Sequence, residues 1–191
     1  MKVACIGSRE TPEDILAGME WIGKIIVQQN WWLASGNALG ADAAYARGGN
    51  SINPKKVMLY LPWSTYNDEL IVPGNVLVTK VEEEWIDIAA RHHPRYPLLS
   101  KGAQSMMIRN AGIVRNADLV IAYLNNRKQG GGGTGHGWRI AETYDIPRFD
   151  LSKKKDQKGV LDHIVELVKK EIGSPARTCT ETRPKSRAHS L

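Results

Sequence analysis

A chain of 191 residues, 42% hydrophobic and 24% charged, has the size and composition of one globular domain. Its net charge of +6 is concentrated at one end: residues 152–191 hold ten Lys/Arg and five Asp/Glu, whereas residues 1–151 hold sixteen and fifteen. No apolar run approaches the roughly 20 residues that span a bilayer, and MKVACIGSRE reaches glycine and charge too early for a signal peptide. We therefore expect no membrane protein and no broad basic surface on the body of the chain.

Short apolar runs alternate with amphipathic runs along the sequence. KVACIG, at residues 2–7, predicts a buried strand stopped by Gly7. TPEDILAGMEWIGKIIVQQN predicts a helix with Thr11 as its N-cap and Pro12 at its first position. The following elements are expected, in chain order, as a strand at 31–36, a helix at 38–49 ended by Gly48 and Gly49, strands at 55–62 and 75–80, helices at 82–93 and 100–116, a strand at 118–124, a helix that begins near Gly135, a strand at 146–151 and a helix at 158–172.

This alternation predicts an α/β fold, a Rossmann-like open parallel sheet with helices on both faces. Residues 1–172 are expected to form a single nucleotide-binding domain, and residues 173–191 a basic, disordered tail with little that can be buried. In such sheets, ligands bind outside the carboxyl ends of the strands. Functional residues should therefore follow the strands.

Three predicted strands end in glycine together with hydroxyl or amide groups. They are followed by GSRE at 7–10, SGNALGAD at 35–42 and the glycine-rich RKQGGGGTGHGWRIAE at 127–142. Each segment leads into a helix, whose free N–H groups and dipole favour an anion. Together they predict a site for a phosphorylated ligand, with a nucleotide as the first expectation. The expected contacts are Gly7, Ser8, Arg9, Ser35, Gly36, Asn37, Gly40, Gly131, Gly132, Gly133 and Thr134.

Each segment also has a simpler interpretation, because the hydroxyl groups can be helix caps and four glycines can be a linker. The linker is disfavoured by its position between the most hydrophobic strand and a helix. Neither a Walker A motif nor G-x-G-x-x-G follows the first strand, which argues against an ATPase and a standard dehydrogenase. The two cysteines are not expected to form a disulfide, because Cys5 lies in a predicted strand and Cys179 in the polar tail at the opposite end of the chain. We therefore expect the reducing environment of the cytoplasm. No zinc spacing is present, and we expect neither a metal nor a cofactor.

GSRE, ASGNALGADAAYA, MMIRNAGIVRNADLVIAY and GGGGTGHGWRIAETYDIP, in that order, resemble the SLOG superfamily over about residues 2–151. This superfamily includes the DNA-processing protein A family, the LOG-type phosphoribohydrolases and the YspA-like proteins. The YspA-like branch is the most similar, with its Gly-Ser-Arg start, Ser-Gly-Gly-x-x-Gly-Ala-Asp turn and Arg-Asn helix. The resemblance implies a Rossmann-like sheet with a nucleotide-type ligand over these loops.

The resemblance also implies roles for individual residues. In LOG-type enzymes an arginine and a glutamate assist cleavage of the N-glycosidic bond of a nucleoside monophosphate. Arg109 corresponds to that arginine, with Asn110 beside it as a ligand contact, and Asp42 matches a position that faces the ligand. The positions of the glutamate are held by His136 and Gly137, so the carboxylate is missing. His136 is the candidate acid or base in its place.

Two positions outside this catalytic set bear on the ligand. Asn37 stands where the family pattern usually has glycine. Trp63 lies in LPWSTYN, directly after a predicted strand, and is our preferred residue for stacking on a base, ahead of Trp138. Packing inside the protein is the alternative for both tryptophans.

Three functions remain open from the sequence. The first is an enzyme that cleaves or transfers at an N-glycosidic bond, which the resemblance favours. The second is a module that binds or senses a nucleotide without chemistry, which the missing carboxylate favours. The third is a DNA-binding protein with the basic tail as its only contact to nucleic acid, which the near-neutral body disfavours. We expect a homo-oligomer that binds a nucleotide-like small molecule.

Overall fold

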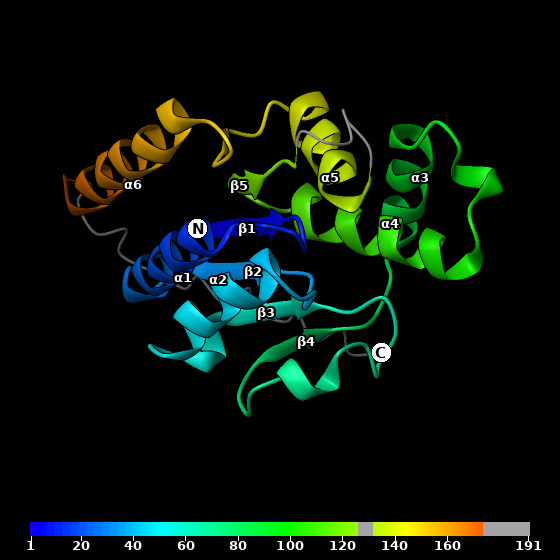
Figure 1. The fold of residues 1–191 in the computed structure, drawn as a ribbon, viewed down its shortest axis with the longest axis horizontal. Coiled ribbons are helices and arrows are strands. Elements are labelled where there is room, and N and C mark those ends of the chain that lie inside the picture. Colours follow the sequence, from blue (N-terminus) through cyan, green and yellow to red (C-terminus); the bar gives the residue numbers. More distant parts are fainter. Residues whose placement is uncertain (126–131, 174–191) are drawn as a thin grey trace, which may run out of the picture.

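The computed structural model describes residues 1–125 and 132–173, within which six strands form one parallel sheet (Figure 1). The predicted contact Gly131 and the predicted tail beyond Gly173 lie outside these residues. The strand order is β4-β3-β2-β1-β5-β6. The strands are β1 (Lys2–Gly7), β2 (Trp32–Ser35), β3 (Val57–Tyr60), β4 (Val76–Val78), β5 (Leu119–Tyr123) and β6 (Arg148–Asp150).

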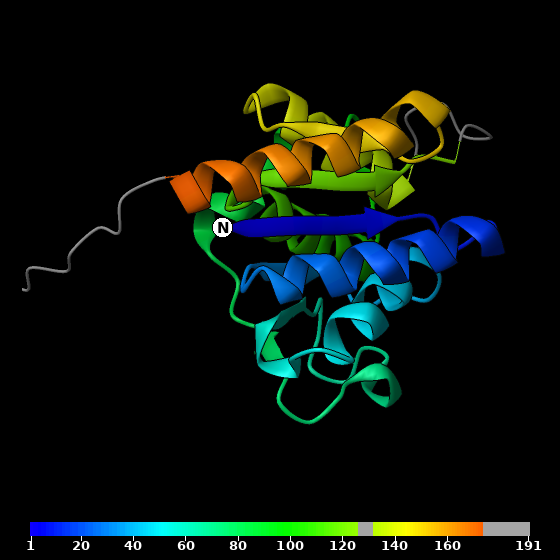
Figure 2. The same ribbon diagram turned by 90° about the vertical axis from the view of Figure 1, so that its left-hand side faces the viewer.

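Helices cover both faces of the sheet, which confirms the predicted fold class. They are α1 (Glu13–Gln28), α2 (Ala41–Asn50), α3 (Glu83–His92), α4 (Lys101–Arg115), α5 (Gly132–Thr143) and α6 (Lys154–Gly173). The apolar cores place α1, α2 and α6 on one face and α3, α4 and α5 on the other. Figure 2, seen from the first of these faces, shows β1 with α6 above it and α1 below it. No helix of the described ranges has the length and hydropathy that a membrane span requires.

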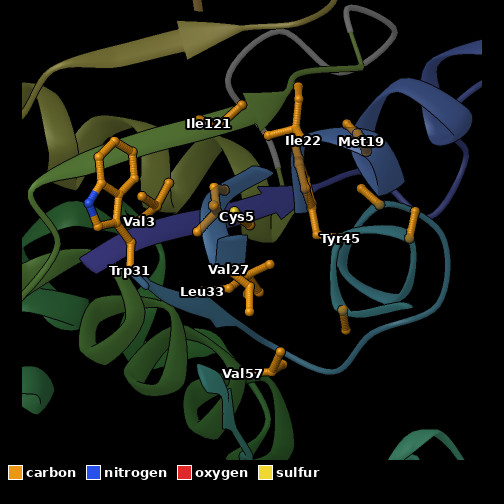
Figure 3. Packing of buried hydrophobic residues seen from close by; sticks show 14 of the residues in the cluster. Val3, Cys5, Met19, Ile22, Val27, Trp31, Leu33, Tyr45, Val57 and Ile121 are labelled. Carbon is orange, nitrogen blue, oxygen red and sulfur yellow. The ribbon is translucent and has the colours of Figure 1, made fainter. Parts of the chain in front are cut away.

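The two cores follow from the alternation of side chains along each strand. In β1, Val3 and Cys5 join the core under α1 and α2, whereas Ala4 and Ile6 join the core under α3, α4 and α5. Figure 3 shows Val3 and Cys5 packed near Leu33 of β2. Because β1 is buried on both faces, its sequence is a continuous apolar run rather than an alternating one.

The strand order changes direction at β1. From β1 the chain moves outward through β2, β3 and β4, and then returns to place β5 on the other side of β1. The connection after β1 therefore runs toward one edge of the sheet and the connection after β5 toward the other edge. This divergence opens a crevice at the carboxyl ends of these two strands. Gly7 ends β1 in register with Tyr123 of β5, so both segments reach this crevice at the same height.

Two local predictions are wrong. Thr11 does not cap α1: its hydroxyl donates to the carbonyl of Ser8 at 2.8 Å, and Pro12 is the capping residue without a side-chain hydrogen bond. Gly48 and Gly49 do not end the second helix, which continues to Asn50. Gly48 is needed for packing instead, because a Cβ there would lie 1.9 Å from the backbone oxygen of Glu20 in α1.

Candidate functional site

A pocket of about 840 Å³ lies at the crevice between the ends of β1 and β5. The segment after β1, the start of α2, the end of β5 and the facing sides of α4 and α5 all contribute to its wall. The residues that line it include Gly7, Ser8, Arg9, Glu10, Asp42, Met106, Met107, Arg109, Asn110, Asn125, Gly132, Gly133, Thr134, Trp138 and Arg139. Nine of the residues predicted from the strand-end motifs and the Arg-Asn helix are thus brought together.

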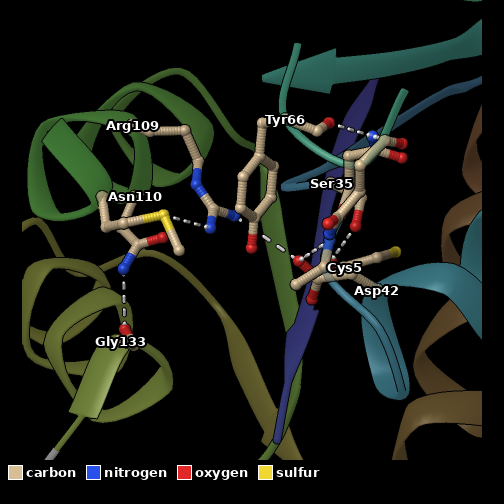
Figure 4. Close-up of polar contacts among 11 residues, drawn as sticks. Cys5, Ser35, Asp42, Tyr66, Arg109, Asn110 and Gly133 are labelled. Carbon is tan, nitrogen blue, oxygen red and sulfur yellow. Dashed lines mark hydrogen bonds and ion pairs between the residues drawn. The ribbon is translucent and has the colours of Figure 1, made fainter. Parts of the chain in front are cut away.

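A buried ion pair forms one wall of this pocket. Arg109 of α4 and Asp42 of α2 are both more than nine-tenths buried, with Nη1 of the arginine 3.5 Å from Oδ2 of the aspartate (Figure 4). The aspartate also accepts the backbone N–H of Ala38 at 3.4 Å. Burial raises the pKa of Asp42, an effect that the nearby guanidinium opposes. Burial likewise lowers the pKa of Arg109 and the carboxylate of Asp42 opposes that effect, so each charge favours the ionised form of the other.

Gly36 is the reason that Arg109 can take this position. A Cβ at residue 36 would lie 1.2 Å from Nη1 of Arg109, inside the guanidinium itself. The preceding residue, Ser35, donates its hydroxyl to the carbonyl of Cys5 at 2.9 Å and is completely buried. Gly36 therefore leaves room for the arginine, Ser35 connects β2 to β1, and neither residue is among those that line the pocket.

The guanidinium of Arg109 has donors that the protein leaves poorly satisfied. Its Nε is buried and has no hydrogen-bond partner among the described residues. Its Nη2 meets the sulfur of Met106 at 3.5 Å, and a thioether is a weak acceptor. The ring of Tyr66, 5.8 Å from Cζ, adds a cation–π contact (Figure 4). An arginine in this state favours an anionic ligand beside it.

The first turn of α5 forms the opposite wall. Gly132 begins the helix with φ at +80°, a conformation that glycine adopts without strain. Asn110 of α4 donates its side-chain amide to the carbonyl of Gly133 at 3.1 Å and so fixes this turn (Figure 4). The free N–H groups and the dipole at the start of a twelve-residue helix favour a negative charge.

Two predicted contacts of the second strand end play a different part. Asn37 has φ at +56°, which explains how asparagine can stand where the family pattern has glycine. Its side-chain amide donates to the carbonyls of Tyr66 and Asn67, both at 2.9 Å, and it borders a separate pocket of about 360 Å³. Gly40, with φ at +78°, packs against the backbone of Arg9. Neither residue is among those that line the larger pocket.

His136 and Trp63 lie away from the larger pocket. His136 is fully buried under α3, with Nε2 3.2 Å from the carbonyl of Ala89, and burial lowers its pKa to about 4. A neutral imidazole inside the core has no route to a proton on a ligand, so its position gives no support to a role as acid or base. Trp63 is 45% exposed and packs edge-on against Tyr66, with ring centroids 5.1 Å apart.

Sequence reasoning missed several residues that line the site. Met106 precedes Arg109 by three positions and Asn110 by four, so the helical period alone places it on their face of α4. Trp138 was not missed: it was the second choice from the sequence for stacking on a base, and it lines the pocket four positions after Thr134 on the same face of α5, whereas the preferred Trp63 does not. Tyr66, which contacts Arg109, gave no such signal because it comes from a loop.

No group of three or more metal-ligating side chains occurs in residues 1–125 and 132–173.

The comparisons with known proteins support the fold. No family model matches the chain, and no curated protein matches it. Among solved structures, the chain is similar to DNA processing protein A from Helicobacter pylori, which was studied for its single-stranded DNA binding mode. The TM-score is 0.55 at 16% sequence identity, over 90% of this chain and 80% of that one. The likeness supports the Rossmann-like fold and gives no support to the YspA-like branch in particular.

Proposed function

We propose that the pocket between β1 and β5 binds the phosphate group of a nucleotide. The observation that carries this proposal is the buried guanidinium of Arg109, which borders the pocket and whose Nε has no partner in the described part of the chain. A phosphate offers pairs of anionic oxygens that can accept two parallel hydrogen bonds from the planar fork of a guanidinium. It would supply the acceptor that Met106 provides only weakly.

The surroundings of Arg109 suit the same ligand. Arg9 adds a second positive side chain to the wall, and Glu10 is engaged by the side-chain amide of Asn125 at 3.1 Å. The N-terminus of α5 faces the pocket at Gly133. Backbone donors and arginines that converge at a strand-order reversal are the usual elements of a phosphate site in an α/β protein.

The geometry supports binding better than cleavage of a glycosidic bond. Such cleavage has an oxocarbenium-like transition state, which needs a carboxylate or a base near the sugar. Asp42 is held against Arg109, and His136 lies in the core. We therefore propose a binding or sensing role as the main function, with Asp42 as the remaining candidate for any reaction.

A second candidate function is the binding of single-stranded DNA. It is favoured by the likeness to DNA processing protein A, whose structure was studied for that property. The ligand chemistry is the same, because each unit of a DNA strand is a nucleotide with a phosphate. In this version the pocket itself contacts the strand, in contrast to the prediction that only the basic tail does so.

Calorimetric titration of the full chain tests both versions. Nucleoside monophosphates represent the free ligand, and a short single-stranded oligonucleotide represents the strand. Arg109→Lys should weaken binding at least about ten-fold, which equals roughly 1.4 kcal/mol, because lysine cannot make the bidentate contact. Arg91→Lys, on the exposed face of α3, is the matched control and should bind as the wild type does.

The pattern of ligands separates the two versions. Binding of the monophosphates alone supports a small-molecule site, and binding of the oligonucleotide alone supports a DNA site. Affinity that is equal in the wild type and in Arg109→Lys, for every ligand that binds, would show that the phosphate is held elsewhere. If no ligand binds, the proposal is wrong.

A further inference from the structure

The larger pocket is lined by both polar and apolar groups. Its polar groups come from the segment after β1, from Asp42, and from Arg109, Asn110 and Thr134 of α4 and α5. The facing sides of α4 and α5 add an apolar group, which consists of Ala103, Met106, Met107 and Trp138. A free phosphate would make no use of this apolar group. Its presence indicates that the ligand has an apolar part as well as a charged one.

The spacing along α5 relates the two parts of the site. Thr134 and Trp138 both line the pocket and are four residues apart, so they lie on one face of the helix about 6 Å apart along its axis. A phosphate at the start of α5 is thus one helical turn from the indole ring. In a nucleotide, the sugar separates phosphate and base by a distance of this order.

The indole of Trp138 is held in place before any ligand binds. The guanidinium of Arg148 lies over the ring, with Cζ 5.4 Å from the ring centroid. Arg148 is fixed in turn by Glu142, with Nη2 and Oε1 2.8 Å apart. A ring whose rotamer is already restricted loses little conformational entropy when a second flat group packs against it.

We propose that a nucleobase packs against Trp138, with Met106 and Met107 as the other apolar contacts. This inference rests on the proposed phosphate site and names the part of the ligand that the apolar group recognises. Among these three side chains, the indole N–H is the one strong hydrogen-bonding group, so contact area and stacking would dominate over readout of the base edge. The site should therefore accept purines and pyrimidines with similar affinity.

The test compares ligands with and without a base. Adenosine and cytidine 5′-monophosphate are titrated beside ribose 5-phosphate, and a short oligodeoxynucleotide is titrated beside its abasic counterpart. The wild type should bind the base-containing member of each pair more tightly. Trp138→Ala should reduce that preference at least about five-fold, the loss that corresponds to roughly 1 kcal/mol of stacking, and leave affinity for ribose 5-phosphate unchanged.

Two further variants make the result specific. Trp138→Phe keeps an aromatic face and should retain most of the preference for a base. Trp21→Ala removes a tryptophan that is 51% exposed on α1, across the sheet from α5, and should change nothing. Equal affinity of the wild type for both members of each pair, or a preference that survives Trp138→Ala, would overturn the inference but leave the phosphate site intact. Absence of binding by all these ligands would overturn both.

Discussion

At the scale of single residues, the burial of His136 makes the stability of the fold depend on pH. Its imidazole has zero exposure, and burial lowers its pKa to about 4, with Arg139 and His93 as smaller contributions in the same direction. In the unfolded chain the pKa is about 6.5. The unfolded state therefore binds more protons between these values, and stability that is full above about pH 6.5 is lost as the pH falls towards 4.

We predict that this group makes the protein about 2 kcal/mol less stable at pH 5 than at pH 7. Urea denaturation of the wild type at the two pH values measures the total loss. His136→Gln should be less stable at pH 7, because a buried site is disturbed, but should lose less stability on going to pH 5. His163→Gln, at a partly exposed position of α6, should lose as much as the wild type. An unchanged loss in His136→Gln would contradict the prediction.

The residue scale also shows how far a motif can be interpreted. GSRE, the GAD turn and the Arg-Asn helix predict that Arg109, Asp42 and Gly7 share one region, because all follow from strand ends or from the resemblance. Tyr66 and Asn67 could not be placed in this way. Their contacts with Arg109 and Asn37 depend on the path of a loop between β3 and β4, which no local periodicity encodes.

At the scale of elements, the contact between α1 and α2 depends on a glycine inside a helix. Glycine commonly follows the last turn of a helix, so the sequence predicts that Gly48 and Gly49 end α2. Inside a helix, glycine costs up to about 1 kcal/mol relative to alanine. Tertiary packing overrides this preference. The helices approach so closely that the backbone of Glu20 lies where the Cβ of residue 48 would be, and the backbone of Tyr45 lies against Gly23 in the same way.

We predict opposite effects for two glycine-to-alanine substitutions in this helix pair. Gly48→Ala should destabilise the protein by about 1–3 kcal/mol, because the backbone at Glu20 has to move. Gly18→Ala, in the middle of α1 where nothing lies within 4 Å of the added Cβ, should stabilise it by up to about 1 kcal/mol. Thermal unfolding of both variants checks this. A stable Gly48→Ala protein would mean that α1 and α2 can slide apart at little cost.

At the scale of the whole molecule, the sequence predicts the order of elements well and their assembly less completely. The sequence predicts each strand of the sheet, and each helix that covers it, near its observed place, because apolar runs and helical periods are local signals. The strand order was not predicted, because it depends on which strands pair after the chain has collapsed. That order places the ends of β1 and β5 side by side and so creates the pocket.

The basic C-terminal segment gives a prediction for the chain as a whole. The apolar cores of the described ranges are formed by residues before Gly173, so a chain that ends at Gly173 should unfold at the same temperature as the full one. The removed segment, residues 174–191, holds four Lys/Arg and one Glu. If it contacts DNA, its removal should lower affinity and make the salt dependence of binding less steep.

Fluorescence anisotropy with a labelled oligonucleotide at several salt concentrations measures this effect. An Arg109→Lys variant of the shortened chain separates the tail from the pocket, because the two contributions add if they contact different parts of the strand. Binding that is unaffected by removal of the tail but lost with Arg109→Lys would assign DNA binding to the pocket alone. A large fall in thermal stability of the shortened chain would contradict the domain boundary.

The contact between Gly36 and Arg109 also limits the order in which these two positions can change over time. The guanidinium occupies the volume of the missing Cβ, so any other residue at 36 requires Arg109 to shift from its place beside Asp42. We expect a change away from glycine at 36 to be tolerated best where Arg109 and Asp42 have already been replaced. The three positions constrain one another, and each restricts the side chains that the other two can tolerate.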